Sequence, residues 1–399
     1  MRRGTACALA LLVAASPAAA QQLELGGQLR PRFEVRDPVP GVETLEFTSM
    51  RTRASLLVTL EDGITGFIQL QDVRVFGEEA STLTDYSADG LDIHQAWAEL
   101  GDPASAGWSV RVGRQEAAYG GERLIGAVNW TQQARAFDGV RVRYRPSADA
   151  AVDAVAFQIS DSEAGTGAAA DRSFYGLYGT VAARGDLDLF ALWDRTDALV
   201  DRDLVTLGGR WASGREDWSW RAEAAYQTGS TEAGVLSRDI SAFMVGLRVG
   251  SSLSDALRAT LWYDYLSGDD DPGDDVTRVF DTLFATNHKF YGYQDLFLNI
   301  PAATGGRGLQ DLALKTSYDV DDDQTLSVDF HLFRLAAADQ LDSGRLGEEL
   351  DLTYRWAYRP GVAVTGGFSY FAAADAWSTF LGNPDDNQVW GYLMLDLVF

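Results

Sequence analysis

The chain consists of segments of about ten residues in which apolar and polar residues alternate, with turn residues between them. In the segment 218–227 the even positions are Trp, Trp, Ala, Ala and Tyr, whereas the odd positions are Ser, Arg, Glu, Ala and Gln. Because successive side chains of a strand point to opposite faces, this period of two predicts strands with one apolar face. From residue 23 onward we find neither a linker nor a long amphipathic helical pattern, which predicts one all-β domain.

About eighteen such segments can be counted, and sixteen is the alternative if a hairpin has been wrongly divided. The predicted strands lie near residues 23–36, 48–60, 65–76, 91–100, 108–117, 136–145, 151–160, 173–183, 187–196, 204–212, 218–228, 238–250, 257–267, 308–319, 324–335, 347–358, 362–372 and 388–399.

The connections between these segments alternate in length. Short turns such as 61–63 and 184–186 alternate with long loops such as 118–135 and 268–307. Short turns at one end, long loops at the other and an even number of strands are typical of transmembrane antiparallel β-barrels. A secreted β-sandwich or propeller is the alternative, but neither needs this alternation, and the chain has no internal repeat.

The first twenty residues have the composition of a secretory signal peptide. A basic start, Met1-Arg2-Arg3, precedes an apolar stretch at 6–15 and the small residues at 16–20. We expect cleavage after Ala20, so that residues 1–20 are a signal peptide and residues 21–399 form the barrel. The expected location is the outer membrane of a Gram-negative cell.

Composition excludes several other classes of protein. The 399 residues carry a formal net charge of -25, which argues against a nucleic-acid binder. The single cysteine, Cys7, lies within the predicted signal peptide, so the mature chain has neither a disulfide nor a cysteine-based metal site. No apolar run of about 18 residues follows it, so we expect no membrane-spanning helix.

The charge predicted for the lumen is opposite to that of the whole chain. If apolar positions face lipid, the alternate positions face the pore, and these include Arg51, Arg53, Arg141 and Arg143. Arg111, Arg221, Arg258 and Arg355 follow the same rule, whereas many carboxylates lie in loops. Because rings of charged side chains select ions of opposite charge, an arginine-lined lumen predicts an anion-selective pore. In the alternative interpretation these arginines only pair across strands with Glu223, Asp264, Asp329 and Asp351.

The alternation changes phase within the segment 68–75, near Gln71 and Asp72. A β-bulge at this point would restore the pattern and turn Asp72 and Arg74 toward the lumen.

An ordered series of motifs resembles the alginate export family of outer-membrane porins. The series consists of LQDVRV (70–75), IHQAW (93–97), RVGRQE (111–116), YGGERLIG (119–126), FDGVR (137–141) and TNHKFYGYQD (286–295), with Trp130, Gln133 and Arg135 between them. The resemblance implies a monomeric eighteen-stranded barrel that passes a polyuronate through an arginine-rich constriction. It also implies pore-facing, substrate-binding roles for Arg74, Arg114, Arg123, Arg135 and Arg141, whereas Arg51, Arg53 and Arg143 rest on alternation alone.

The expected partners are an anionic polysaccharide or oligosaccharide, outer-membrane lipid and lipopolysaccharide, and a periplasmic protein that feeds the pore. An uptake porin for acidic oligosaccharides or small organic anions is the second interpretation, since a passive pore conducts both ways. Trp262, if it points inward, offers a flat face to sugar rings.

A lipid-modifying outer-membrane enzyme is the least favoured interpretation. Its base would be one of the histidines His94, His288 and His331, but no serine stands beside them in a recognised arrangement. We therefore expect neither catalysis nor a cofactor. The acidic runs 269–271 and 274–275 are candidates for weak Ca²⁺ binding in a loop, or for divalent ions that bridge to lipopolysaccharide.

Overall fold

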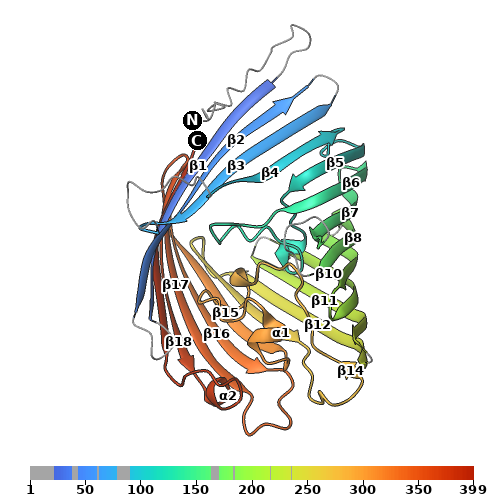
Figure 1. Ribbon diagram of the computed structural model, residues 1–399. Coiled ribbons are helices and arrows are strands. Elements are labelled where there is room, and N and C mark those ends of the chain that lie inside the picture. Colours follow the sequence, from blue (N-terminus) through green and yellow to red (C-terminus); the bar gives the residue numbers. More distant parts are fainter. Residues whose placement is uncertain are drawn as a thin grey trace, which may run out of the picture.

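Eighteen strands form a closed antiparallel barrel (Figure 1), in which the first strand pairs with both the second and the last. This computed structural model describes residues 22–37, 44–60, 63–78, 90–162, 170–182, 185–215, 217–234 and 236–399, so the predicted signal peptide lies outside the described residues. Within those ranges, no helix has the length and apolar character needed to cross a membrane.

The barrel strands are β1 (Gln22–Asp37), β2 (Leu45–Thr59), β3 (Ile64–Val75), β4 (Leu91–Leu100), β5 (Gly107–Gln115), β6 (Phe137–Ser147), β7 (Ala150–Ser160), β8 (Asp171–Ala182), β9 (Asp186–Asp197), β10 (Asp201–Arg215), β11 (Trp218–Ala233), β12 (Leu236–Ser252), β13 (Leu257–Leu266), β15 (Leu309–Asp321), β16 (Gln324–Leu335), β17 (Arg345–Arg359), β18 (Val362–Ala373) and β19 (Gln388–Val398). The two-residue strand β14 (Val276–Thr277) pairs in parallel with β12 and is not part of the ring.

Each of the eighteen predicted segments corresponds to one barrel strand, so the predicted fold class and the count of eighteen are confirmed. The alternation that predicted them is clear in β12. Phe243, Leu247 and Val249 are 45–59 % exposed on the outside, whereas Ala242 and Met244 are almost fully buried on the inside. An apolar outer face is the surface that such a barrel presents to lipid.

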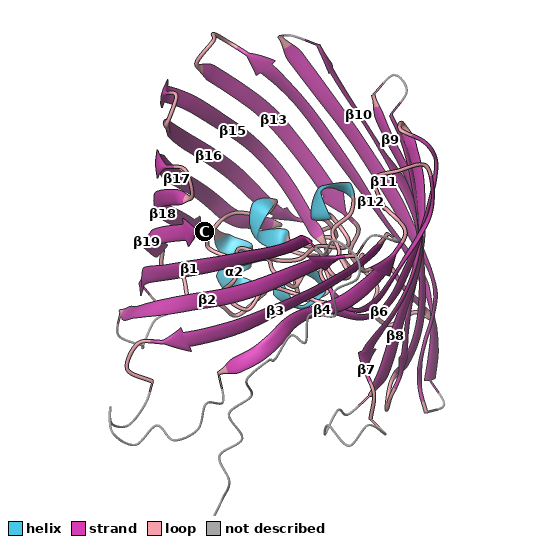
Figure 2. Cartoon of the chain, turned by 90° about the horizontal axis from the view of Figure 1, so that it is seen from above, coloured by secondary structure: helices cyan, strands magenta, loops and turns pink. Residues whose placement is uncertain are grey.

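Two long connections enter the interior of the barrel, and Figure 2 shows them inside the ring of strands. The first inner segment, residues 116–136, joins β5 to β6 and includes the short helix η1 (Gly120–Glu122). The second inner segment, residues 267–308, joins β13 to β15 and includes β14, η2 (Asn287–Lys289) and α1 (Ile300–Ala303). A fourth short helix, α2 (Asp375–Thr379), follows β18.

The hydrophobic core of the protein lies inside the barrel. Phe280, Phe284, Phe290 and Phe297 of the second inner segment are at most 6 % exposed and belong to one cluster with buried side chains of the barrel wall. Because aromatic rings favour burial, these four residues hold the segment against the wall instead of leaving it as an external loop.

The predicted bulge in β3 is wrong. The pairing of β3 with β2 runs without interruption from Thr65 to Val75, and the irregularity lies on the other side, where Gln69 pairs with Gln95 and Leu70 with Ile93. The extra residue is therefore His94 of β4. Since β3 keeps a strict alternation, Asp72 stays on the same outward face as Leu70.

Candidate functional site: an arginine-lined lumen

The two inner segments are joined to each other across the lumen. Ile125 and Phe284 form a parallel β-bridge, and the amides of Gly126 and Phe284 donate to the carbonyls of Phe284 and Leu124 at 2.8 and 2.9 Å. Lys289 Nζ lies 2.9 Å from Glu122 Oε1. The segments therefore act as one unit that narrows the barrel.

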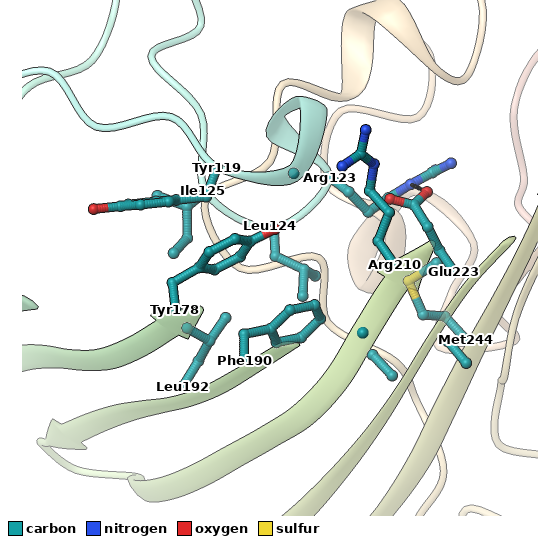
Figure 3. Close-up of a pocket in the computed structure, with 14 residues that line it drawn as sticks. Tyr119, Arg123, Leu124, Ile125, Tyr178, Phe190, Leu192, Arg210, Glu223 and Met244 are labelled. Carbon is teal, nitrogen blue, oxygen red and sulfur yellow. Dashed lines mark hydrogen bonds and ion pairs between the residues drawn. The ribbon is translucent and has the colours of Figure 1, made fainter. Parts of the chain in front are cut away.

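Arg123 fixes this unit to the wall. Its guanidinium, 4 % exposed, lies 2.8 Å from Asp264 Oδ2 and 3.4 Å from Glu223 Oε2 and donates to Tyr291 Oη at 2.6 Å. Burial by itself lowers the pKa of Arg123, but the combined effect of Asp264, Tyr291 and Glu223 outweighs burial, and the pKa is raised. Figure 3 shows Arg123 and Glu223 beside Leu124 and Met244, where the first inner segment covers strands β8 to β12.

Arginines of β1 and β2 hold the other end of the first inner segment through its backbone carbonyls. Arg30 donates to the carbonyls of Asn129 and Thr131 at 2.7 and 2.8 Å, and Arg32 donates to that of Trp130 at 2.9 Å. Neither arginine is among the site residues predicted from the sequence. Both lie on inward-facing positions of the predicted strand 23–36, and this alternation could have identified them.

Four predicted residues lie inside the barrel but hold the inner segments in place. Arg123 is one of them. Arg51 donates to the Thr131 carbonyl at 3.4 Å, Arg53 donates to Asn129 Oδ1 at 3.4 Å, and Arg135 donates to the Phe284 carbonyl. Their hydrogen-bonding groups are thus largely occupied by the protein itself.

Arg141 and Arg143 lie on the inner face of β6. Arg141 Nη2 is 2.8 Å from Glu99, and Arg143 Nε is 2.6 Å from Asp153. Arg143 lines an open pocket of about 450 Å³ that lies beside the short turn 148–149.

Arg74 and Arg114 face outward, contrary to the expectation that both face the pore. In β5, Ser109 and Gln115 are buried on the inner face, so the even positions, including Arg114, belong to the outer face; Arg114 pairs there with Asp138 at 2.7 Å. Arg74 bonds to Asp72 at 2.7 Å on the face opposite to Gln71. The physical reason is the unbroken alternation of β3 and β5.

Several ion pairs of the wall share one arrangement, in which the arginine is more exposed than its carboxylate partner. The exposed side-chain fractions are 25 and 3 % for Arg143 and Asp153, and 17 and 6 % for Arg210 and Asp188. An aspartate is short and stays at the wall, whereas an arginine extends beyond it. Each pair is neutral in total, but its positive end faces the lumen.

Carboxylates of β13 to β17 are covered by the second inner segment. Glu349 accepts a hydrogen bond from the Gln294 amide at 2.9 Å, Asp351 accepts one from the Tyr293 amide at 3.3 Å, and both side chains are at most 1 % exposed. Asp311, also buried, contacts His331 at 2.9 Å. The charges of these acids are therefore shielded from the lumen.

The other candidate groups are also engaged. Trp262 does lie on the inner face, but the Arg248 guanidinium stacks on it at 3.5 Å. His94 and His288 contact Glu116 and Asp295 at 2.7 and 2.6 Å. In the acidic runs, Asp269 lies 3.1 Å from Arg238 and 3.6 Å from Arg278. Asp274 lies 3.8 Å from Arg238 and 2.9 Å from Arg278. Across the described ranges, no three or more His, Cys, Asp and Glu side chains gather into a group that could hold a metal ion.

Comparisons with known proteins agree with this architecture. No curated protein sequence matches the chain. The barrel is similar to Pseudomonas aeruginosa OccK5 (OpdH), with 11 % identity, 94 % of this chain and 98 % of that chain covered and a TM-score of 0.61. It is also similar to Acinetobacter baumannii OccAB4, with 11 % identity, 95 % of this chain and 98 % of that chain covered and a TM-score of 0.65. For P. aeruginosa OprD the identity is 15 %, the coverage is 94 % of this chain and 95 % of that chain, and the TM-score is 0.60. At these identities the likeness establishes the fold.

A family described as alginate export matches residues 21–383, nearly the whole chain. Family and fold together indicate a channel rather than an enzyme. The chain is an outer-membrane porin barrel, and it belongs to the alginate export family.

Proposed function

We propose that this porin is anion-selective and exports an acidic polysaccharide of the alginate-like polyuronate class. The observation that carries the proposal is the arrangement of the wall, where arginines extend into the lumen and their carboxylate partners stay buried behind them. The burial of Glu349 and Asp351 under the second inner segment supports it further, because it removes negative charge from the path.

The mechanism requires no covalent step. A polyuronate carries a carboxylate on each sugar, and moving it out of bulk water is opposed by desolvation unless fixed cations compensate. Arg143, Arg210 and Arg221 offer guanidinium groups at successive positions around the wall, each already bonded to a carboxylate. Such sites attract an anion without holding it tightly, and weak binding at several sites is what conduction needs.

The test is the reversal potential of the refolded barrel in a planar bilayer with a salt gradient. We expect a reversal potential whose sign indicates that anions permeate more readily than cations. We also expect oligouronate to block the current. Cation selectivity without block would overturn the proposal and leave a pore whose arginines serve only the wall.

Uptake of acidic oligosaccharides or small organic anions is a second candidate. The hydrogen bonds that join the two inner segments near Ile125 and Phe284 favour it, because the joined segments occupy space inside the barrel that a long polymer would need. Liposome swelling assays with uronates of different chain lengths distinguish the two candidates. Permeation by monomeric glucuronate but not by long oligouronates supports uptake of small anions, whereas permeation by both supports export of the polymer.

A further inference from the structure

Arg248 of β12 is a buried arginine that lacks a counter-ion. Its side chain points inward and is 8 % exposed, yet within the described ranges its Nε and Nη2 atoms have no hydrogen-bond partner. A buried charge is costly unless it is paired and hydrogen-bonded. The guanidinium therefore lacks an acceptor that an anion from the lumen would provide.

The neighbouring charges make this position electropositive. Arg221 of β11 lies directly opposite Arg248 in the sheet, and Arg123 approaches from the first inner segment. The two nearby carboxylates are already used, since Glu223 contacts Arg123 and Arg221 at 3.4 and 3.3 Å and Asp264 contacts Arg123 at 2.8 Å. Three guanidinium groups thus share two carboxylates, which leaves one positive charge in excess.

Trp262 sets the orientation of the Arg248 guanidinium. The two residues are directly opposed between β12 and β13, and the Arg248 Cζ atom lies 3.5 Å from the centre of the ring. Stacking on an aromatic face leaves the N–H groups at the edge of the guanidinium plane, where a carboxylate accepts two parallel hydrogen bonds. An ammonium group lacks this planar fork.

The site opens into a pocket of about 660 Å³. Arg221, Arg248 and Trp262 line it together with Arg210, and its rim is formed by Gly185 and Asp186 and by the adjoining ends of β10 and β11 at Ser213, Gly214 and Ser219. In outer-membrane barrels the short turns are periplasmic. The pocket therefore opens toward the compartment from which an exported polymer would come.

We propose that Arg248, oriented by Trp262 and supported by Arg221, binds the carboxylate of a sugar acid at the periplasmic end of the lumen. This inference rests on the proposed function and deepens it. It assigns the first binding position for the anionic cargo to the wall formed by β11, β12 and β13. The central residue, Arg248, is not among the site residues predicted from the sequence.

The test is isothermal titration calorimetry of the full-length barrel in detergent, with sodium glucuronate as the probe and glucose as its neutral counterpart. We expect binding of glucuronate alone, and a loss of affinity of at least tenfold in Arg248→Gln. Arg258→Gln is the matched control, because it removes the same charge from a residue that pairs with Asp319 outside this pocket. Arg258→Gln is expected to keep the wild-type affinity.

Two further measurements keep the test decisive. Arg248→Lys preserves the charge without the fork, so an affinity as high as that of the wild type would overturn the bidentate geometry. Heat-modified mobility on gels establishes that each variant is folded. Absence of glucuronate binding to the wild type, or equal affinity in folded Arg248→Gln, would overturn the site.

The experiments test the Arg248 site and the proposed function separately. An anion-selective wild-type pore whose glucuronate affinity does not depend on Arg248 overturns the site alone. A cation-selective pore with Arg248-dependent binding overturns the proposed selectivity and leaves the site standing.

Discussion

Arg123 and Asp264 form an ion pair of 2.8 Å in the interior of the barrel, with side chains 4 and 1 % exposed. The pair joins the first inner segment to β13, and Tyr291 Oη accepts a hydrogen bond from the same guanidinium, which ties in the second inner segment. One side chain therefore connects both inner segments and the wall.

The variant Arg123→Met is expected to be strongly destabilised. It leaves Asp264 and Glu223 buried with reduced compensation, and removing one partner of a buried pair costs about 3–5 kcal/mol. We expect a lower unfolding temperature, measured by the loss of heat-modified gel mobility, together with a noisier channel current. Arg258→Gln is the control, since its partly exposed pair with Asp319 should contribute at most about 1 kcal/mol. An equal effect of both substitutions would contradict the assigned role of Arg123.

A disulfide between the inner segments should leave conductance unchanged. Ile125 and Phe284 are bridge partners, so cysteines at these positions lie within the reach of a disulfide. The variant carries Ile125→Cys and Phe284→Cys together with Cys7→Ser. Its single-channel conductance is measured before and after reduction of the disulfide. Equal single-channel conductance in the two states is expected if the segments move as one unit. A conductance that rises on reduction would mean that the segments separate when the pore opens.

Selectivity should respond to the inward arginines and not to the outward ones. Arg143→Gln removes the exposed member of its pair with Asp153 and brings negative charge to the lumenal surface. Because a unit charge at 4 Å contributes about 1 kcal/mol in water, the anion-to-cation permeability ratio should fall roughly two- to fivefold. Arg114→Gln, on the outer face, should keep the wild-type ratio. The reversal potential in a salt gradient measures both, and an equal shift would refute the assignment of faces.

Acid should loosen the first inner segment through Glu116. Burial by itself would raise the pKa of Glu116, but the hydrogen bond from His94 and the charge of Arg53 keep it below its usual value near 4.5. A carboxyl whose pKa is lowered by folding stabilises the folded state above its unfolded pKa, and this contribution is lost as the pH falls through the folded value. We expect current noise to increase below about pH 4.5 more in the wild type than in Glu116→Gln. Identical pH profiles would show that Glu116 does not hold the segment.

The sequence contained the whole barrel because each strand carries its own alternation, and all eighteen predicted strands are present. The same local rule gave the inward faces of Arg141 and Arg143. It also puts Arg114 outside, beside Val112 and opposite in phase to Arg111, so the family resemblance misled where the pattern was right.

Other features depend on contacts that no local pattern encodes. The bulge belongs to His94 in β4, and only the register between two strands reveals which of them has the extra residue. The path of the inner segments depends on the bridge between Ile125 and Phe284, far apart in the chain. The phenylalanines at 280, 284, 290 and 297 were the one local sign that a long connection would be buried.

The buried aspartates and extended arginines make the inner wall a layer of radial dipoles. The potential near this wall then depends on the difference in side-chain length and not only on the net charge of -25. Asp153→Glu or Asp188→Glu adds one methylene at constant total charge and shortens the dipole from its negative end. A protein can thus become less permeable to anions without gaining or losing a single charge.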